Sequence, residues 1–162
     1  MYVQQADFFF GTSMTFANEV MKTAIRESHP AGTILFEEGE AADRLYVLLE
    51  GRVRISLGES GHVVYIVSRG GEAFGWSSLV GRERYSASAE TVEPTTLIFF
   101  ERERFHQVLE KDPANGMRLY EGLAKTLAGR LLETYRIIAG LSSSEQTVAS
   151  ASGQFMSAEP AV

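Results

Sequence analysis

The sequence predicts an α+β domain in which short antiparallel strands are preceded by a helical segment and followed by a long helix. Between residues 33 and 100, short apolar segments alternate with turn residues, a pattern typical of a β-sandwich or β-barrel. From about residue 101 onward, the apolar residues take the spacing of a helix. The chain has 162 residues, which is enough for one domain with its own core.

The first 27 residues are the predicted N-terminal helical segment. Their apolar residues recur at loosely helical spacing. The pattern stops at Pro30 and Gly32, which both interrupt regular structure. We expect this helix to cover one side of the core. Its apolar positions are Phe8, Phe9, Phe16, Val20, Met21 and Ile25.

The strands are predicted from segments rich in aliphatic and aromatic residues. Gly51 divides one long segment into two strands, and the loop Gly-Glu-Ser-Gly predicts a hairpin. Pro94 divides the last segment, because proline is excluded from the middle of a sheet. The predicted strand segments are TILFEEG (33–39), DRLYVLLEGRVRISL (43–57), HVVYIVSRGG (62–71) and YSASAETVEPTTLIFFE (85–101).

Two helices are predicted after the strands. The first spans about residues 101–111 and closes at Asp112-Pro113. The second spans 114–141, about 40 Å at 1.5 Å per residue. Its apolar stripe must pack on the barrel or on the same helix of a second chain, and we expect a homodimer through 114–141. Residues 142–162, rich in Ser and Ala, predict a disordered tail. The apolar stripe of the second helix consists of Leu119, Leu123, Leu127, Leu131, Tyr135 and Ile138.

Charge and composition limit the partners of the chain. The formal net charge is −6 at pH 7, so the protein as a whole repels nucleic acid and anionic membranes. The absence of cysteine excludes disulfides and thiolate metal sites. The N-terminal residues do not have the pattern of a signal peptide. No apolar run approaches the roughly 20 residues that span a bilayer. We therefore expect a cytoplasmic protein.

A specific motif runs through residues 29–55, HPAGTILFEEGEAADRLYVLLEGRVRI. It resembles the cyclic-nucleotide-binding domain family, which includes the effector domains of catabolite activator proteins. The resemblance covers roughly residues 20–140. It implies an antiparallel β-roll, or jelly roll, with its C-terminal helix, over residues 28–141. The matching residues are Pro30, Gly32, Leu35, Phe36, Glu38, Gly39, Glu40, Ala42, Asp43, Leu45, Tyr46, Gly51 and Val53.

The family's ligand site is expected in the segment that begins at residue 74. In the family, a Phe-Gly-Glu turn opens a short helix whose N–H groups hold the cyclic phosphate, and the Glu accepts a hydrogen bond from the ribose. Here Trp76 replaces that Glu, and an indole has one donor and no acceptor. Backbone donors of this turn are still expected to bind an anion. The expected cradle consists of Phe74, Gly75, Trp76, Ser77, Ser78 and Leu79.

The family also places an arginine at the start of the next strand, where it neutralises the phosphate. In one register, Tyr85 takes the arginine position, and Ala87 and Ala89 face inward. A slip of one residue would place Arg84 there and turn the alanines outward. We favour the register with Tyr85 at the arginine position. The predicted ligand contacts in this segment are Arg84, Tyr85, Ser86 and Ala87.

Arg130 on the long helix aligns with a residue that touches the base in catabolite activator proteins, and it is a candidate for the missing positive charge. Three outcomes stay open. The pocket holds a changed ligand on which Trp76 and Tyr85 stack, it binds an ordinary cyclic nucleotide, or the two aromatic side chains fill it. No cofactor is expected other than a cyclic nucleotide or another phosphate-bearing ligand.

No enzyme is expected. His29, His62 and His106 stand apart, without the His-x-His pair of the cupins, which share the β-roll, and no catalytic motif is present. The segment after residue 141 is too short for a helix-turn-helix, so we expect no DNA binding by this chain alone. The expected role is a non-catalytic sensor in which a ligand shifts the long helix and a protein partner reads it. The rival is a ligand-free structural dimer.

Overall fold

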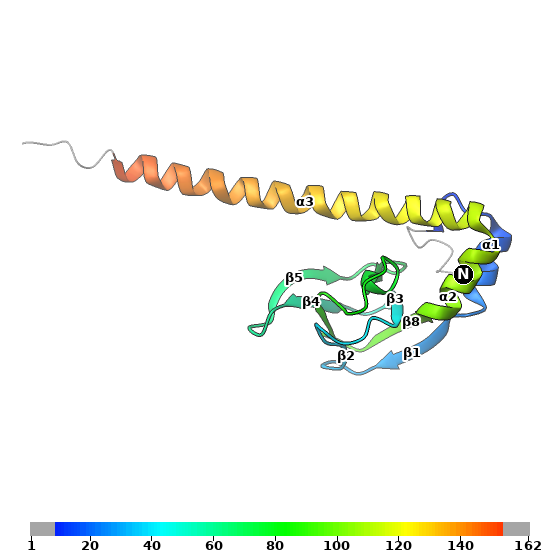
Figure 1. The fold of residues 1–162 in the computed structure, drawn as a ribbon. Helices are drawn as coiled ribbons and strands as arrows, with labels where there is room; N and C mark the ends of the chain where they lie inside the picture. The colour runs from blue at the N-terminus through cyan, green and yellow to red at the C-terminus, as the bar shows by residue number, and fades with distance from the viewer. Residues whose placement is uncertain (1–8, 154–162) are drawn as a thin grey trace, which may run out of the picture. The chain divides into compact units, whose positions relative to one another are not determined.

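The computed structural model describes residues 9–153, with the side chains of residues 9–140. The chain divides into two compact units, Met1–Leu123 and Ala124–Val162. The strands lie in the first unit together with helices α1 (Met14–Met21) and α2 (Arg102–Lys111) (Figure 1). Helix α3 (Pro113–Gly153) begins in the first unit, and its remainder belongs to the second.

Two four-stranded antiparallel sheets form a β-roll in the first unit (Figure 1). Their strand orders are β1-β8-β3-β6 and β2-β7-β4-β5. Strands distant in sequence lie side by side, as where β1 pairs with β8 from Ile25↔Phe99 to His29↔Thr95. The predicted α+β fold with an antiparallel β-roll is thus confirmed. The strands are β1 (Ile25–His29), β2 (Ile34–Phe36), β3 (Arg44–Glu50), β4 (Val53–Leu57), β5 (His62–Val67), β6 (Ala73–Phe74), β7 (Ser88–Thr91) and β8 (Thr95–Glu101).

The core of the roll is aromatic at the end that carries the candidate site. The ring of Tyr46 on β3 lies 5.3 Å from that of Phe74 on β6 and 5.5 Å from that of Phe36 on β2. Aromatic pairs at such distances add to the stability gained by burial alone. The buried cluster consists of Phe36, Ala42, Tyr46, Leu48, Val53, Val67, Phe74, Tyr85, Ala89, Leu97 and Phe99.

Strand β3 is buried on both faces. Tyr46 and Leu48 point into the roll. Leu45 lies on the other face, paired with Phe100, whose ring lies 5.3 Å from that of Phe105 on α2. Both faces of this strand are apolar, because the interior of the roll lies on one side and a helix lies on the other.

Local signals in the sequence explain where the helices begin. The Ser13 hydroxyl accepts a hydrogen bond from the N–H of Phe16 and caps α1. Asp112 accepts one from the N–H of Asn115 at 3.1 Å, and Pro113 occupies the first position of α3, where its missing N–H is not needed. The predicted break at Asp112-Pro113 is therefore the junction between α2 and α3.

Two predicted boundaries are wrong. The N-terminal helix was expected to reach residue 27, but Ile25–His29 forms β1, because pairing with β8 outweighs a weak helical spacing. The tail was expected to be disordered from residue 142, but α3 continues to Gly153, since no proline or glycine interrupts residues 142–152. Residues 1–8 and 154–162 lie outside the described part of the chain.

Candidate functional site

The candidate site is the turn between β6 and β7. Gly75 adopts φ 78°, a left-handed conformation that favours glycine, and a single turn of 3₁₀ helix follows at Trp76–Ser78. A Cβ atom on Gly75 would lie 3.2 Å from both the Arg44 carbonyl oxygen and the Tyr46 ring, and 3.5 Å from the Tyr85 ring. The turn is therefore packed closely against β3 and Tyr85.

Some of the donors expected to bind an anion are used within the turn itself. The N–H of Ser78 donates to the Gly75 carbonyl at 3.2 Å, and that of Leu79 to the Trp76 carbonyl at 2.9 Å. The Ser78 hydroxyl also donates to the Gly75 carbonyl. The 3₁₀ geometry thus uses the N–H groups of Ser78 and Leu79, and anion binding by the backbone donors of this turn stays a prediction.

Tyr85 points into the core, and only 4% of its surface is exposed. Its ring stacks on Phe36 with the centroids 3.8 Å apart and the planes 16° apart. Its hydroxyl accepts from the N–H of Arg44 at 3.1 Å and donates to the carbonyl of Arg44 at 2.8 Å. The Tyr85 side chain therefore has its polar and apolar surfaces satisfied within the protein.

Burial affects the ionisation of the two phenols in this cluster. Removal from solvent is the main cause that raises the pKa of Tyr85 well above its usual range, and the nearby Tyr46 adds to it. Burial also raises the pKa of Tyr46, while the adjacent Arg44 works against it. Both hydroxyls consequently remain protonated donors over the physiological range.

Arg84 faces the opposite way. It is exposed, and its guanidinium donates to the carbonyl of Gly39 at 2.6 Å. Backbone bonds hold the same segment to the turn after β2: Gly39 donates to Tyr85 at 2.9 Å, and Tyr85 donates to Glu40 at 2.9 Å. Tyr85 and Ala89 are buried, as the favoured register expects, while Ala87 is half-buried. The predicted contact of Arg84 with a ligand stays a prediction.

The other predicted site residues are placed at different depths. Phe74, Ser77, Ser78 and Leu79 are buried, Trp76 and Ala87 are half-buried, and Ser86 is exposed. Arg130 is half-buried and belongs to the second unit, so its predicted contact with a ligand stays a prediction. Sequence reasoning missed Arg44. Its contact with Tyr85 uses the backbone N–H and carbonyl, which every residue type except proline has, so the residue identity gives no signal.

Tyr85 also lines a cavity of about 370 Å³. Tyr46 and Phe36 contribute aromatic walls, while Glu40, Asp43 and Arg44 lie around it. The Arg44 guanidinium lies 4.4 Å from the centre of the Phe99 ring, a favourable cation–π distance.

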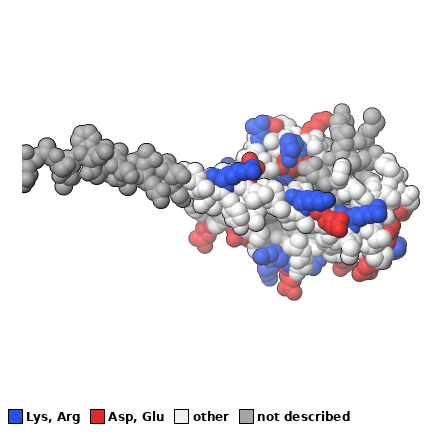
Figure 2. All heavy atoms as spheres, turned by 90° about the horizontal axis from the view of Figure 1, so that it is seen from above, with Lys and Arg blue, Asp and Glu red and all other residues white. Residues whose placement is uncertain are grey.

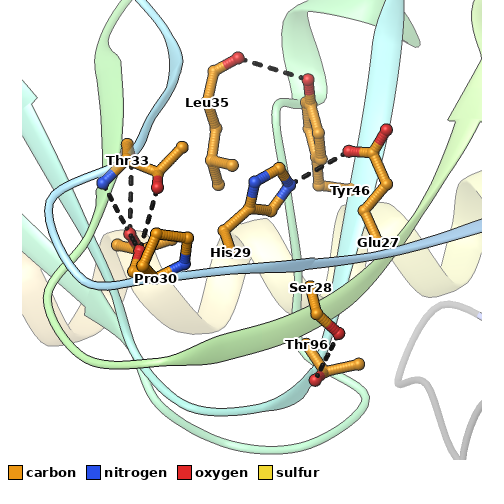
Figure 3. A network of polar contacts seen from close by, with 9 residues as sticks. Glu27, Ser28, His29, Pro30, Thr33, Leu35, Tyr46 and Thr96 are labelled. Carbon is orange, nitrogen blue, oxygen red and sulfur yellow. Dashed lines mark hydrogen bonds and ion pairs between the residues drawn. The ribbon is translucent and has the colours of Figure 1, made fainter.

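Two of the histidines considered as metal ligands have other partners. His29 lies 3.0 Å from the Glu27 carboxylate on the same strand, as Figure 3 shows, and His62 contacts the Ser60 hydroxyl. The same view shows the hydroxyl of Tyr46 directed at the Leu35 carbonyl, 3.4 Å away. Across residues 9–140, no three His, Asp or Glu side chains converge on one point.

The cyclic nucleotide-binding domain model matches residues 26–112, more than half of the chain. The chain belongs to this family. It is 32% identical over 111 residues to the cyclic AMP receptor protein of Thermus thermophilus, covering 67% of this chain and 49% of that protein. A solved structure from Geobacter metallireducens GS-15, assigned to cyclic nucleotide binding, has a TM-score of 0.69 at 26% identity, covering 81% of this chain and 98% of that one.

The family domain also occurs inside enzymes. The chain is 27% identical over 103 residues to the cGMP-dependent 3′,5′-cGMP phosphodiesterase A of Dictyostelium discoideum, covering 64% of this chain and 11% of that enzyme. The chain thus spans half or less of the length of these curated relatives. None of the helices in the described residues is long and apolar enough to cross a membrane.

Proposed function

We propose that this protein is a non-catalytic sensor or regulatory module whose pocket is altered away from ordinary cyclic AMP binding. The observation that carries the proposal concerns Tyr85, which we place at the family's arginine position. Its hydroxyl accepts a hydrogen bond from the N–H of Arg44 and donates one to the carbonyl of Arg44. A phenol that the protein already binds in this way does not neutralise a phosphate. Trp76 likewise supplies no acceptor for a ribose hydroxyl.

The expected loss of affinity follows from these two substitutions. A hydrogen bond to a charged group contributes about 1.5–3 kcal/mol. Each tenfold change in affinity corresponds to about 1.4 kcal/mol, so the missing arginine alone lowers the affinity for a cyclic phosphate roughly ten- to hundredfold. The ligand we propose is a small anionic or nucleotide-like molecule, held by the remaining backbone donors of the turn and stacked on the ring of Trp76.

The proposed output is a change in the position of α3 when the pocket is occupied, read by a protein partner. We also propose a homodimer through residues 114–141. Its support is a set of apolar side chains on α3 that are 37% to 68% exposed in the single chain and would be covered by a second helix. The exposed residues are Met117, Tyr120, Leu131, Leu132, Tyr135, Ile137 and Ile138.

The surface supports a regulatory role without nucleic acid. Figure 2 shows one face of the molecule, on which basic and acidic side chains are interspersed among uncharged residues. Such a distribution, with the net charge of −6, does not favour DNA. The proposed setting is the cytoplasm.

The alternative function is a ligand-free structural dimer. The dense packing of Tyr85 favours it, because a ring stacked on Phe36 at 3.8 Å fills space that a ligand would otherwise use. In this reading Trp76 and Tyr85 close the pocket, and α3 serves only to join two copies.

Thermal unfolding of the full chain separates these functions. The ligands are cyclic AMP, cyclic GMP, cyclic dinucleotides, linear nucleotides and inorganic phosphate. Ligand at about 100 times its Kd adds about 2.7 kcal/mol, which raises Tm by several degrees. We expect a shift with one of these other than cyclic AMP, lost in Trp76→Ala and kept in the control Phe10→Ala, because Phe10 is an exposed aromatic residue outside the pocket and outside α3. No shift with any ligand supports the structural dimer, and a large shift with cyclic AMP alone contradicts the altered pocket.

A gain-of-function variant tests the cause. Trp76→Glu combined with Tyr85→Arg restores the family's acceptor and arginine, and cyclic AMP should then bind more tightly than to the unchanged chain. For the dimer, Leu131→Glu should dissociate it in sedimentation equilibrium, while Lys125→Glu, also exposed on α3, should not. Unchanged association in Leu131→Glu would place the dimer contact elsewhere.

A further inference from the structure

The outer face of the sheet β2-β7-β4-β5 carries one row of four side chains across all its strands. Ile34 on β2 pairs with Glu90 on β7, Glu90 pairs with Arg54 on β4, and Arg54 pairs with Ile66 on β5. Paired residues on neighbouring strands point to the same face. Their neighbours Val53, Val67 and Ala89 are buried in the roll, so this row faces away from the core.

The row is apolar at both ends and charged in the middle. Ile34 is 58% exposed and Ile66 is 38% exposed. Between them Arg54 and Glu90 form an ion pair at 2.5 Å. The solvent face of an antiparallel sheet is usually polar, and exposed aliphatic residues on it indicate a contact surface. Val64, the residue two before Ile66 on β5, is 51% exposed and extends the apolar character of this strand.

The order of the row makes it complementary to itself. It runs apolar, acidic, basic, apolar from β2 to β5. A two-fold axis parallel to the strands, between two stacked copies, reverses this order in the second copy. Ile34 of one copy then lies opposite Ile66 of the other, and Glu90 lies opposite Arg54. No like charges face each other, which is the condition for a contact in which both copies use the same surface.

We propose that a second copy of this chain docks face to face on this sheet. The charge complementarity of the row favours this occupant, since a different partner would have to present the same sequence of side chains. The contact is separate from the proposed pairing of α3 and does not rest on the proposed function of the pocket. Where both contacts form, they link chains into an assembly larger than a dimer.

Cysteine cross-linking tests the contact directly, because the chain has no cysteine of its own. Variants I34C and I66C are purified separately as full chains. Each variant alone, and an equimolar mixture of the two, is treated with a bismaleimide linker that reaches about 10 Å, the spacing of two stacked sheets. In the proposed contact, position 34 of one copy lies opposite position 66 of the other, whereas two copies of the same position are three strand spacings apart along the row, about 14 Å. We expect a covalent dimer in the mixture and little in either variant alone.

Two results would overturn the proposal. One is a mixture that gives no more covalent dimer than the separate variants, with both folded by circular dichroism. The other is equal cross-linking in I34C alone, since its two copies of position 34 lie at opposite ends of the proposed contact.

Charge exchange provides an independent test. R54E and E90R each place like charges opposite each other between copies, and each should lose this association in sedimentation velocity. Mixing R54E chains with E90R chains restores opposite charges between copies, although the ion pair within each chain stays broken. We expect the mixture to associate more strongly than either variant. Equal association of the mixture and the single variants would contradict the face-to-face contact.

Discussion

Replacing Tyr85 by phenylalanine removes only the hydroxyl that joins the segment before β7 to the start of β3. The ring can still stack on Phe36, so apolar burial is retained. Two hydrogen bonds disappear, one from the N–H of Arg44 at 3.1 Å and one to its carbonyl at 2.8 Å. A buried backbone group left without a partner costs about 1–3 kcal/mol. We expect Tyr85→Phe to lower the free energy of unfolding by about 1–3 kcal/mol.

Urea unfolding followed by tryptophan fluorescence measures this change. Trp76 is the single tryptophan of the chain and lies in the turn beside Tyr85, so the signal reports on the same region. The control is Ser86→Ala, because it also removes one hydroxyl and Ser86 is exposed beside Tyr85. The control should stay within about 0.5 kcal/mol of the unchanged protein. Equal stability of the two variants would refute the structural role assigned to the Tyr85 hydroxyl.

Three further predictions concern pH and backbone geometry. The raised pKa values of Tyr85 and Tyr46 mean that the neutral phenols stabilise the fold. The free energy of unfolding, measured in urea, should therefore fall as the pH rises above about 10. The fall should be less steep in Tyr85→Phe. Hydrogen bonds from Asn115, first from its side chain and then from its backbone, lower the pKa of Asp112. The contribution of the Asp112 carboxylate to the stability of the fold should therefore be lost as the pH falls below about 4. Acid unfolding of Asp112→Asn should lack this loss of stability. Gly51→Ala should cost more than Gly58→Ala in thermal unfolding. Both glycines have positive φ, which costs an alanine about 1–2 kcal/mol at either position. Only at Gly51 would the new Cβ atom also clash, because it would lie 2.5–2.7 Å from atoms of Pro94 and Thr95. Equal Tm losses would show that the clash is relieved.

Local patterns in the sequence were sufficient for most of the roll. The strand segments, the hairpin loop and the break at Pro94 were predicted because alternation and turn chemistry act over a few residues. Asp112-Pro113 was predicted as a helix boundary for the same reason. β1 was not predicted, since its partner β8 lies about 70 residues further along the chain and its own sequence is a weak strand former.

The candidate site was only partly predictable. The replacement of the family's Glu and Arg by Trp76 and Tyr85 was visible in the sequence. The partners of Tyr85 were not, because its hydroxyl binds the backbone of Arg44, 41 residues away, and backbone groups carry no sequence signal. The same holds for the guanidinium of Arg84, whose observed partner is also a backbone group, the carbonyl of Gly39.

The sequence by itself determined the family, most of the succession of strands and helices, and the residue types at the candidate site, because each depends on side-chain identity and short-range spacing. Only the tertiary structure decided that Tyr85 is a bound part of the core, that two donors of the turn are used internally, and that Ile34, Glu90, Arg54 and Ile66 align in one row. These depend on which distant strands pair and in what register. Register follows from the summed burial of the whole sheet and not from any single segment.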